Sequence, residues 1–437
     1  MKKRMLLLPG MAGMLLAPLQ VYAQETAQIA NKIDTGDTAF VLLSAALVML
    51  MTPGLAMFYG GMVRRKNVLG TIMQSFVAIA VISIQWILFG YSLSFGPDVH
   101  GLIGNLSWVG LSGVGTAPNP DYAPTIPHLA FMIYQAMFAV ITPALIAGAF
   151  AERMKFSAYL IFTLVWTTIV YDPVAHWVWG AGGWLKNMGV MDFAGGIVVH
   201  ITSGVSALAA ALLMGKRKGH AHDFTPHNLP MTVIGAGLLW FGWFGFNAGS
   251  ALSAGTLSVT TFVATHISAV GATLTWVIIE WLHRGKPTMF GAATGSIAGL
   301  ATITPASGFV GPMPALIIGL LAGAVCYIAL NMKTRLGYDD SLDAFGVHGV
   351  GGILGTFAAG LFAQTLINPS GQNGLLFGNP KAFITQTIAI AVTIAYSFIV
   401  TLVLLKIIDK TVGLRVDEES EVIGLDITQH GESGYTL

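Results

Sequence analysis

Charged side chains are scarce in this sequence. Only 9% of the 437 residues are Asp, Glu, Lys or Arg, whereas 54% are hydrophobic and the mean hydropathy is +0.72. A soluble domain carries about 25% charged residues, so this chain cannot cover a water-exposed surface, which predicts a polytopic membrane protein. The net charge of +1 argues against a nucleic-acid partner.

Cysteine is nearly absent as well. The single cysteine, Cys326, lies in an apolar run, so an intrachain disulfide is excluded and the redox compartment is not indicated. A membrane enzyme would need a nucleophile with a base or a cluster of metal ligands, and the apolar segments lack such a set. We therefore expect no enzyme activity, no metal and no cofactor.

The first residues have the pattern of an export signal. Lys2, Lys3 and Arg4 precede the apolar run 5–19, and Val21-Tyr22-Ala23 is a cleavage site of the small-x-small type. The pattern predicts a cleaved signal peptide over residues 1–23, with an uncleaved first helix as the alternative. A membrane domain over 24–409 and a cytoplasmic tail over 410–437 would follow.

Long apolar runs fill the rest of the chain. A membrane-spanning helix needs about 20 mainly apolar residues, and the gaps between the runs are short, so we expect one all-α membrane domain with eleven transmembrane helices. The predicted segments are 38–62, 69–94, 128–151, 156–175, 193–214, 229–250, 259–282, 288–304, 310–331, 342–364 and 380–408.

Basic residues occupy alternate loops between these segments. The opposite loops hold only Lys186 and Lys381. Because basic loops stay in the cytoplasm, this bias predicts an amino end outside and a carboxyl end inside. The basic loops contain Arg64, Arg65 and Lys66; Arg153 and Lys155; Lys216, Arg217 and Lys218; Arg284 and Lys286; and Lys333 and Arg335.

Two histidines stand in similar contexts. Asp192 precedes His200, and Asp343 precedes His348. In both stretches an aromatic residue and several small residues lie between the carboxylate and the histidine. Ionisable residues inside a bilayer are costly and indicate function. If segments six to ten repeat one to five in inverted orientation, with one extra helix, the two rings approach the midplane from opposite sides. Facing imidazoles can share a proton.

Aromatic residues gather at the predicted outer end. Tyr134 and Phe138 are four positions apart on one helix face, Trp179 follows the fourth segment, and Ser250 closes the sixth. Ring faces and a hydroxyl can hold a small cation. The alternative for each aromatic residue is ordinary packing, but their convergence with the histidine pair favours a site.

Several motifs in order resemble the ammonium transporter family (Amt/Mep/Rh), with bacterial Amt proteins the more similar. The resemblance covers essentially the whole chain after residue 23. It implies a homotrimer with one pore in each subunit. The motifs are Met51–Arg64, Asp192–His200, Trp240–Ser250, Phe345–Gly352 and Thr411–Arg415.

The resemblance also implies roles for individual residues. Tyr134 stands where bacterial members often have phenylalanine, which adds a hydroxyl to the outer aromatic site. The implied roles are ammonium binding for Trp179, Ser250, Tyr134 and Phe138; a stacked ring gate for Phe138 and Phe246; twin pore histidines for His200 and His348; a pore wall for Trp243; and a supporting carboxylate for Asp192.

The resulting expectation is inward transport of ammonium and methylammonium across the inner (plasma) membrane for nitrogen uptake. Ammonium would lose its proton at the outer mouth, ammonia would cross, and the proton could travel separately over the histidines. The alternatives are an Rh-like gas channel for neutral ammonia and an ammonium sensor, although the short polar tail after residue 410 predicts no signalling domain.

The resemblance implies that a PII-type protein docks near this tail.

Overall fold

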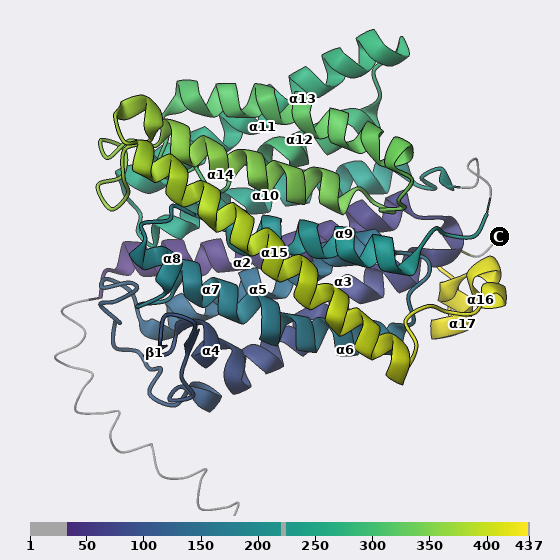
Figure 1. Ribbon diagram of the computed structural model, residues 1–437, viewed down its shortest axis with the longest axis horizontal. Helices are drawn as coiled ribbons and strands as arrows, with labels where there is room; N and C mark the ends of the chain where they lie inside the picture. Colours follow the sequence, from purple (N-terminus) through teal and green to yellow (C-terminus); the bar gives the residue numbers. More distant parts are fainter. Residues whose placement is uncertain (1–32, 220–223, 436–437) are drawn as a thin grey trace, which may run out of the picture.

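The computed structural model describes residues 33–219 and 224–435, and its helices lie side by side in one bundle (Figure 1). Residues 1–23, over which a signal peptide is predicted, lie outside the described residues. Most of the large apolar side chains in the interior belong to one continuous core.

Within residues 33–219 and 224–435, ten helical segments are long and apolar enough to cross a membrane. Their lengths run from 18 to 32 residues, which suits a hydrocarbon core of about 30 Å at 1.5 Å per residue. The prediction of a mainly helical membrane protein is confirmed. The segments are Thr35–Met62, Arg65–Phe95, His128–Phe150, Phe156–Asn187, Gly196–Met214, Leu229–Ala251, Thr256–Arg284, Pro312–Leu336, Phe345–Phe362 and Pro380–Thr411.

The predicted segment 288–304 corresponds to a shorter helix, α12. It runs over Met289–Ile303 and has 15 residues, or about 22 Å at 1.5 Å per residue. All but three of its residues are buried, so its surroundings are mainly protein rather than lipid. A helix enclosed in this way need not match the bilayer thickness. The count of eleven spanning helices therefore stays a prediction.

Several long segments are divided by breaks in the regular α-helix. The bounds of the helices and of the β1–β2 strand pair, in chain order, are α2 Thr35–Met62, η1 Arg65–Asn67, α3 Val68–Gln85, η2 Trp86–Gly90, α4 Tyr91–Phe95, β1 Asp98–Val99, β2 Ile103–Gly104, η3 Val109–Leu111, α5 His128–Phe150, α6 Phe156–Trp166, η4 Thr167–Tyr171, α7 Asp172–Trp179, α8 Trp184–Asn187, η5 Gly196–Ile201, α9 Thr202–Met214, α10 Leu229–Ala248, η7 Gly249–Ala251, α11 Thr256–Arg284, α12 Met289–Ile303, α13 Pro312–Leu336, η8 Phe345–Gly349, α14 Val350–Phe362, η9 Leu375–Phe377, α15 Pro380–Thr411, α16 Glu418–Ile423 and α17 Leu425–His430.

Two of the breaks carry the histidines. The turns η5 and η8 are π-helical, and they contain His200 and His348 respectively. A π-turn widens the helix by one residue and leaves the α-helical hydrogen-bond pattern, which is why such turns are frequent at functional sites. Both turns open a helix, since η5 leads into α9 and η8 leads into α14.

Glycines let these two elements cross closely. A Cβ atom added to Gly204 of α9 would lie 2.1 Å from the backbone nitrogen of Gly349 in η8. A Cβ atom added to Gly352 of α14 would lie 2.9 Å from the Cβ atom of His200. Larger side chains at either position would push the helices apart. The glycines therefore permit the approach of the two histidine turns.

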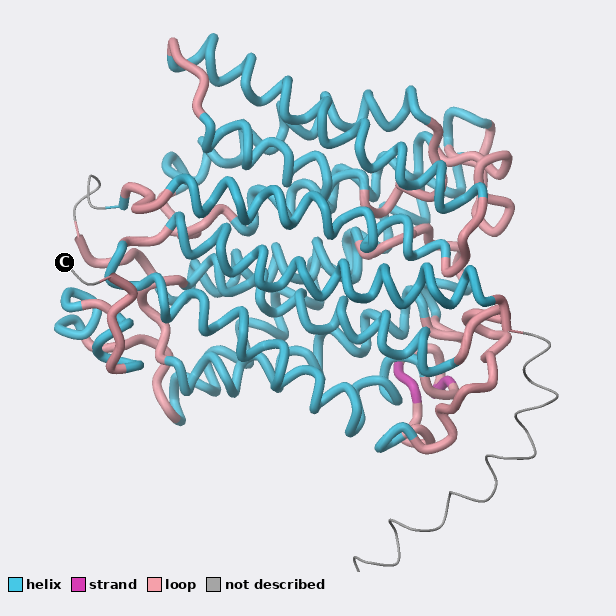
Figure 2. Tube along the Cα trace, turned by 180° about the vertical axis from the view of Figure 1, so that it is seen from behind, coloured by secondary structure: helices cyan, strands magenta, loops and turns pink. Residues whose placement is uncertain are grey.

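The predicted basic loops meet at one end of the bundle. Arg64 and Arg217, from different loops, both contact the carboxylate of Glu152, at 2.9 and 3.4 Å. Helices α16 and α17 of the tail lie at this end, drawn in yellow in Figure 1. The strands β1 and β2, magenta in Figure 2, lie at the opposite end. The end with the basic loops is called the inner end below, following the predicted orientation.

Candidate functional site

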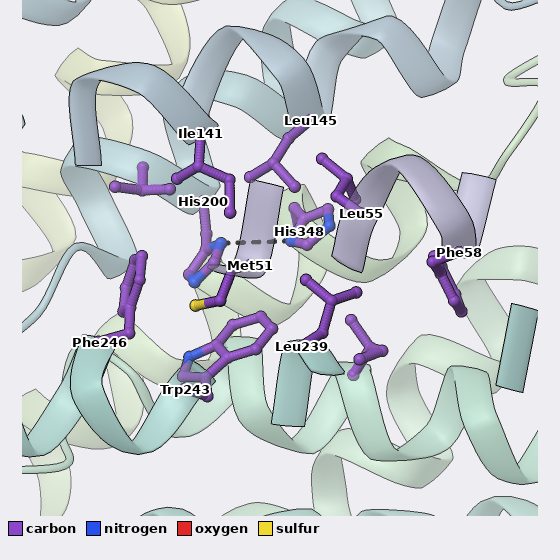
Figure 3. A pocket seen from close by; sticks show the side chains of 12 residues that line it. Met51, Leu55, Phe58, Ile141, Leu145, His200, Leu239, Trp243, Phe246 and His348 are labelled. Carbon is purple, nitrogen blue, oxygen red and sulfur yellow. Dashed lines mark hydrogen bonds between the residues drawn. The ribbon is translucent and has the colours of Figure 1, made fainter. Parts of the chain in front are cut away.

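His200 and His348 meet inside the bundle. Their Nδ1 atoms are 3.2 Å apart, and the ring centroids are 5.2 Å apart with an interplanar angle of 15°. Figure 3 shows the two rings side by side, with the contact drawn as a dashed line. A hydrogen bond between two Nδ1 atoms needs one donor and one acceptor, so the pair shares one proton. The structure thus brings together the two histidines that the sequence analysis paired.

The turn with His200 starts from a buried carboxylate. The oxygens of Asp192 accept hydrogen bonds from the four backbone N–H groups of residues 195–198, at 2.6 to 3.1 Å. Burial raises the pKa of Asp192, and these four donors partly offset the rise. The backbone carbonyl of Asp192 accepts the indole N–H of Trp179 at 2.8 Å. Asp192 therefore fixes both the histidine turn and the outer tryptophan.

The turn with His348 has an equivalent carboxylate, Asp340. Its oxygens accept the backbone N–H groups of Ala344 and Phe345 at 3.1 and 2.8 Å. Asp343, which the sequence analysis matched to Asp192, forms an ion pair with Lys333 instead. The correct match is visible in the spacing, because eight positions separate 192 from 200 and 340 from 348.

A narrow apolar cavity lies beside the histidine pair (Figure 3). The volume open to the centre of a water-sized molecule is about 10 Å³, which is close to the room that one water needs. A hydrated ion does not fit such a space, whereas a small neutral molecule does. The lining residues are Met51, Leu55, Phe58, Ile141, Leu145, Val199, His200, Leu239, Trp243, Phe246, Ile297 and His348.

A pair of rings separates this cavity from a second hollow. The ring centroids of Phe138 and Phe246 are 4.3 Å apart with an interplanar angle of 38°. Phe246 lines the histidine cavity, and Phe138 lines the other hollow. Trp243 continues the wall, because its ring lies nearly parallel to His200 and its N–H donates to Thr304 Oγ1 at 3.0 Å.

The second hollow, called the outer hollow here, has a volume of about 180 Å³. Three residues of the predicted binding site line it, namely Phe138, Trp179 and Ser250. The rings of Phe138 and Trp179 are nearly perpendicular, with centroids 6.0 Å apart. The hydroxyl of Ser250 lies 2.9 Å from the carbonyl of Phe246, so its proton can be donated there while its oxygen accepts.

Tyr134, also predicted to bind substrate, is not among the residues that line the outer hollow. Its side chain is buried, and its hydroxyl lies 2.9 Å from the carbonyls of Gly245 and Phe246 and 3.1 Å from Ser250 Oγ. Tyr134 therefore supports Ser250 from behind the site. Its extra hydroxyl adds to this support rather than to the lining of the hollow.

Comparison with known proteins decides the family. The sequence model described as the Ammonium Transporter Family matches residues 39–435. This chain belongs to the ammonium transporter family. It is 53% identical over 404 residues to "Ammonium transporter" of Bacillus subtilis, covering 92% of this chain and 99% of the relative. It is 49% identical over 405 residues to "Ammonium transporter Amt1" of Archaeoglobus fulgidus, covering 92% and 100%.

Solved structures agree with this assignment. Candida albicans Mep2 is similar at a TM-score of 0.86 and 36% identity, covering 93% of this chain and 92% of that one. A structure titled "Sensor Amt Protein" is similar at a TM-score of 0.83 and 29% identity, covering 93% and 100%. Together with its ten long apolar helices in the described residues, the family makes this ammonium transporter a multi-pass protein of the plasma membrane.

Sequence reasoning missed four polar or charged residues among those that line the outer hollow of this transporter. Two of them lie in the loop before α5 and one lies in the short helix α8, and hydropathy does not predict how these segments fold. Gln135 was the easiest to find, because it lies three positions before Phe138 and so on the same side of its helix. The four residues are Asp121, Tyr122, Gln135 and Lys186.

Metal ligands do not gather at this site. Among residues 33–219 and 224–435, no group of three or more His, Cys, Asp or Glu side chains is arranged to hold a metal ion. The chemistry available along the two hollows is therefore that of ring faces, hydroxyl and amide groups, imidazoles, and the charged groups of Asp121 and Lys186.

Proposed function

We propose that this chain carries ammonium into the cell by binding the ion in the outer hollow, removing one proton, and passing ammonia along the histidine cavity. The main observation behind this proposal is that the Phe138–Phe246 ring pair lies between the outer hollow and the histidine cavity. Trp179 and Ser250 line the outer hollow, and His200 and His348 line the apolar cavity. Membership of the ammonium transporter family supports ammonium as the transported species.

The outer hollow suits a small monovalent cation. The faces of Phe138 and Trp179 attract positive charge through their ring quadrupoles, and the oxygen of Ser250 accepts a hydrogen bond from the ion. No carboxylate is needed for such binding, and a weakly held ion can leave quickly. Methylammonium keeps three N–H donors and one positive charge, so it is a substrate as well.

The narrow cavity favours the neutral form for the crossing. An ion that leaves water for an apolar passage loses its hydration, at a cost far above that for a neutral molecule. Ammonia avoids this cost and still donates and accepts hydrogen bonds. The proton is therefore removed near the ring pair, and the ring pair keeps the cavity closed to hydrated ions.

The histidine pair provides a separate path for the proton. The shared proton between the two Nδ1 atoms leaves one Nε2 as a donor and the other as an acceptor. A proton can enter at one ring and leave at the other if both rings then reorient. Net transport would in that case move one positive charge for each ammonium.

Electrical recording on proteoliposomes tests this function. We expect an inward current on addition of ammonium, and an uptake of labelled methylammonium that ammonium competes away. Liposomes without protein and potassium additions serve as controls. Uptake without any ammonium-dependent current would overturn the charge-moving mechanism and favour the Rh-like alternative of neutral ammonia conduction.

An ammonium sensor with little flux is the second candidate. The similarity to the structure titled "Sensor Amt Protein" favours it. A sensor would use the same outer hollow for binding, so binding alone does not distinguish the two functions. Ammonium binding to the purified protein, combined with no uptake in the proteoliposomes, would support the sensor and contradict the transporter.

Assembly and orientation belong to the same proposal. The chain forms a homotrimer with one pore in each subunit, with the amino end outside after removal of residues 1–23, as the resemblance and the basic loops imply. Residues 410–437 form a cytoplasmic regulatory tail near which a PII-type protein docks. Mass measurement of the detergent-solubilised protein and amino-terminal sequencing test the trimer and the cleavage.

A further inference from the structure

A lysine side chain shares the outer hollow with the residues of the proposed ammonium site. Lys186 lines the hollow together with Phe138, Trp179 and Ser250. Its Nζ atom donates to the backbone carbonyl of Trp179 at 3.0 Å. It also lies over the ring of Tyr122, 5.7 Å from the ring centroid. The family resemblance and the proposed mechanism assign no role to this residue.

The surroundings of Lys186 match those proposed for the substrate. An ammonium group is held by a ring face and an oxygen acceptor, which are the two kinds of group that the site offers to a free ammonium ion. The chain therefore keeps a tethered cation in the hollow of about 180 Å³ that the substrate must enter. Two positive charges in so small a space repel each other.

A carboxylate, whose charge is opposite to that of Lys186, lines the same hollow. Asp121 belongs to the loop before α5, and its backbone N–H donates to the side chain of Asn119 at 3.0 Å. This hydrogen bond fixes the turn that carries the carboxylate. Asp121 attracts an entering cation, whereas Lys186 repels it. The remaining lining residues of the hollow are uncharged.

We propose that Lys186 and Asp121 set the affinity and the charge selectivity of the outer site, with Lys186 acting as a valence filter. The inference rests on the proposed ammonium site in the outer hollow. Because the Coulomb energy scales with the charge of the ion, the repulsion from Lys186 is twice as large for a divalent cation or a diamine as for ammonium. The factor by which Lys186 weakens binding is therefore squared for divalent ions.

The test uses the full-length protein in proteoliposomes and measures initial rates of labelled methylammonium uptake. We expect Lys186→Gln to lower the KM about threefold to fivefold, the upper part of the range found for single charge pairs near a surface. Asp121→Asn should raise the KM by a similar factor, and Lys186→Arg should keep the wild-type value. Lys381→Gln removes an exposed lysine that does not line the hollow and serves as the matched control.

Salt and divalent ions separate an electrostatic role from a structural one. The effect of Lys186→Gln should shrink between ionic strengths of about 0.01 and 0.15 M, where the screening length falls from about 30 to 8 Å. Inhibition of uptake by Ba²⁺ should strengthen about tenfold or more in this variant. A KM change in Lys186→Gln that does not depend on ionic strength, or a similar KM change in Lys186→Arg, would overturn the filter. Lys186 would then act only by donating a hydrogen bond to the Trp179 carbonyl.

Ser250→Ala separates this inference from the function beneath it. If Ser250→Ala raises the KM while Lys186→Gln leaves it unchanged, the filter is wrong and the ammonium site stands. If Ser250→Ala leaves the KM unchanged while Lys186→Gln lowers it, the charge effect stands and the site is wrong. Size-exclusion profiles and melting temperatures of all variants confirm that each is folded.

Discussion

At the scale of single residues, the histidine pair combines two properties that rarely occur together. Both rings are buried beside an apolar cavity, and the Nδ1 atom of each ring is the hydrogen-bond partner of the other. In the described part of the chain, His200 Nε2 has no hydrogen-bond partner, so it is available to a molecule in the cavity. Replacing both rings with alanine would widen the cavity and remove the imidazole nitrogens from its wall, so that a partly hydrated ion could enter.

The first prediction concerns this pair. We expect the double variant His200→Ala and His348→Ala to fold, because it removes volume beside an existing cavity, but to lose discrimination between ammonium and potassium by about tenfold or more, equivalent to about 1.4 kcal/mol. Uptake of labelled methylammonium and of a potassium analogue measures the ratio. His266→Ala, outside the cavity lining, is the control. An unchanged ratio would contradict the proton path.

Sequence reasoning reached part of the candidate site at this scale, namely the histidine pair and three residues that line the outer hollow. His200, His348, Phe138 and Trp179 were found because each is a polar or aromatic group in an otherwise small and apolar context. Lys186 was noticed only as a loop charge, since its place in the outer hollow depends on loops that have no periodic pattern. The buried position of Tyr134 likewise depends on the path of the backbone around Gly245–Phe246.

At the scale of elements, hydropathy located the long helices but not their breaks. A sufficiently long run of apolar residues identifies a membrane-spanning segment, whether or not its backbone is a regular α-helix throughout. The π-helical turns η5 and η8 depend instead on local hydrogen bonds to Asp192 and Asp340. Hydropathy treats both carboxylates as polar ends of segments, so it does not reveal the shared architecture of the two turns, although the equal spacing of Asp192 to His200 and Asp340 to His348 does indicate it.

Two neighbouring aspartates before η8 provide the second prediction, because their pKa values move in opposite directions. Burial raises the pKa of Asp340 from 3.8 to about 6, although Lys333 partly offsets the rise. Burial would also raise the pKa of Asp339, but its hydrogen bonds and ion pairs with Arg217 outweigh this and hold it at about 2. The two carboxylates therefore contribute to stability in different pH ranges.

For Asp340, the folded state binds the proton more tightly than the unfolded state does. Its contribution to the free energy of unfolding should increase by roughly 3 kcal/mol as the pH falls from about 7 to about 3. The contribution of Asp339 is fully present above about pH 4 and is lost as the pH falls towards 2, by roughly 2 kcal/mol. The measurement compares melting temperatures of wild type, Asp340→Asn and Asp339→Asn in detergent from pH 3 to 7. Parallel trends for the two variants would contradict this assignment.

At the scale of the whole molecule, the tail ties together loops that are far apart in the sequence. Asp426 accepts the backbone N–H of Gly70, at the start of α3, at 2.8 Å. Glu421, which is buried, pairs with Arg415 at 2.8 Å and accepts the backbone N–H of Lys218 at 2.5 Å. The residues of the tail predicted only a short polar segment, because such a segment has no sequence pattern that reveals its docking partners.

The last prediction concerns this docking. We expect Glu421→Gln combined with Asp426→Asn to release the tail, because the first change removes the buried carboxylate that pairs with the partly exposed Arg415, and the second deprives the N–H groups at the start of α3 of a charged acceptor. Release should make residues 412–435 more sensitive to protease, lower the uptake rate, and weaken capture of a purified PII-type protein. Glu419→Gln, which removes an exposed charge from the same helix, should change none of these. Wild-type protease resistance in the double variant would show that docking does not depend on these carboxylates, whereas a released tail with normal uptake would contradict its regulatory role.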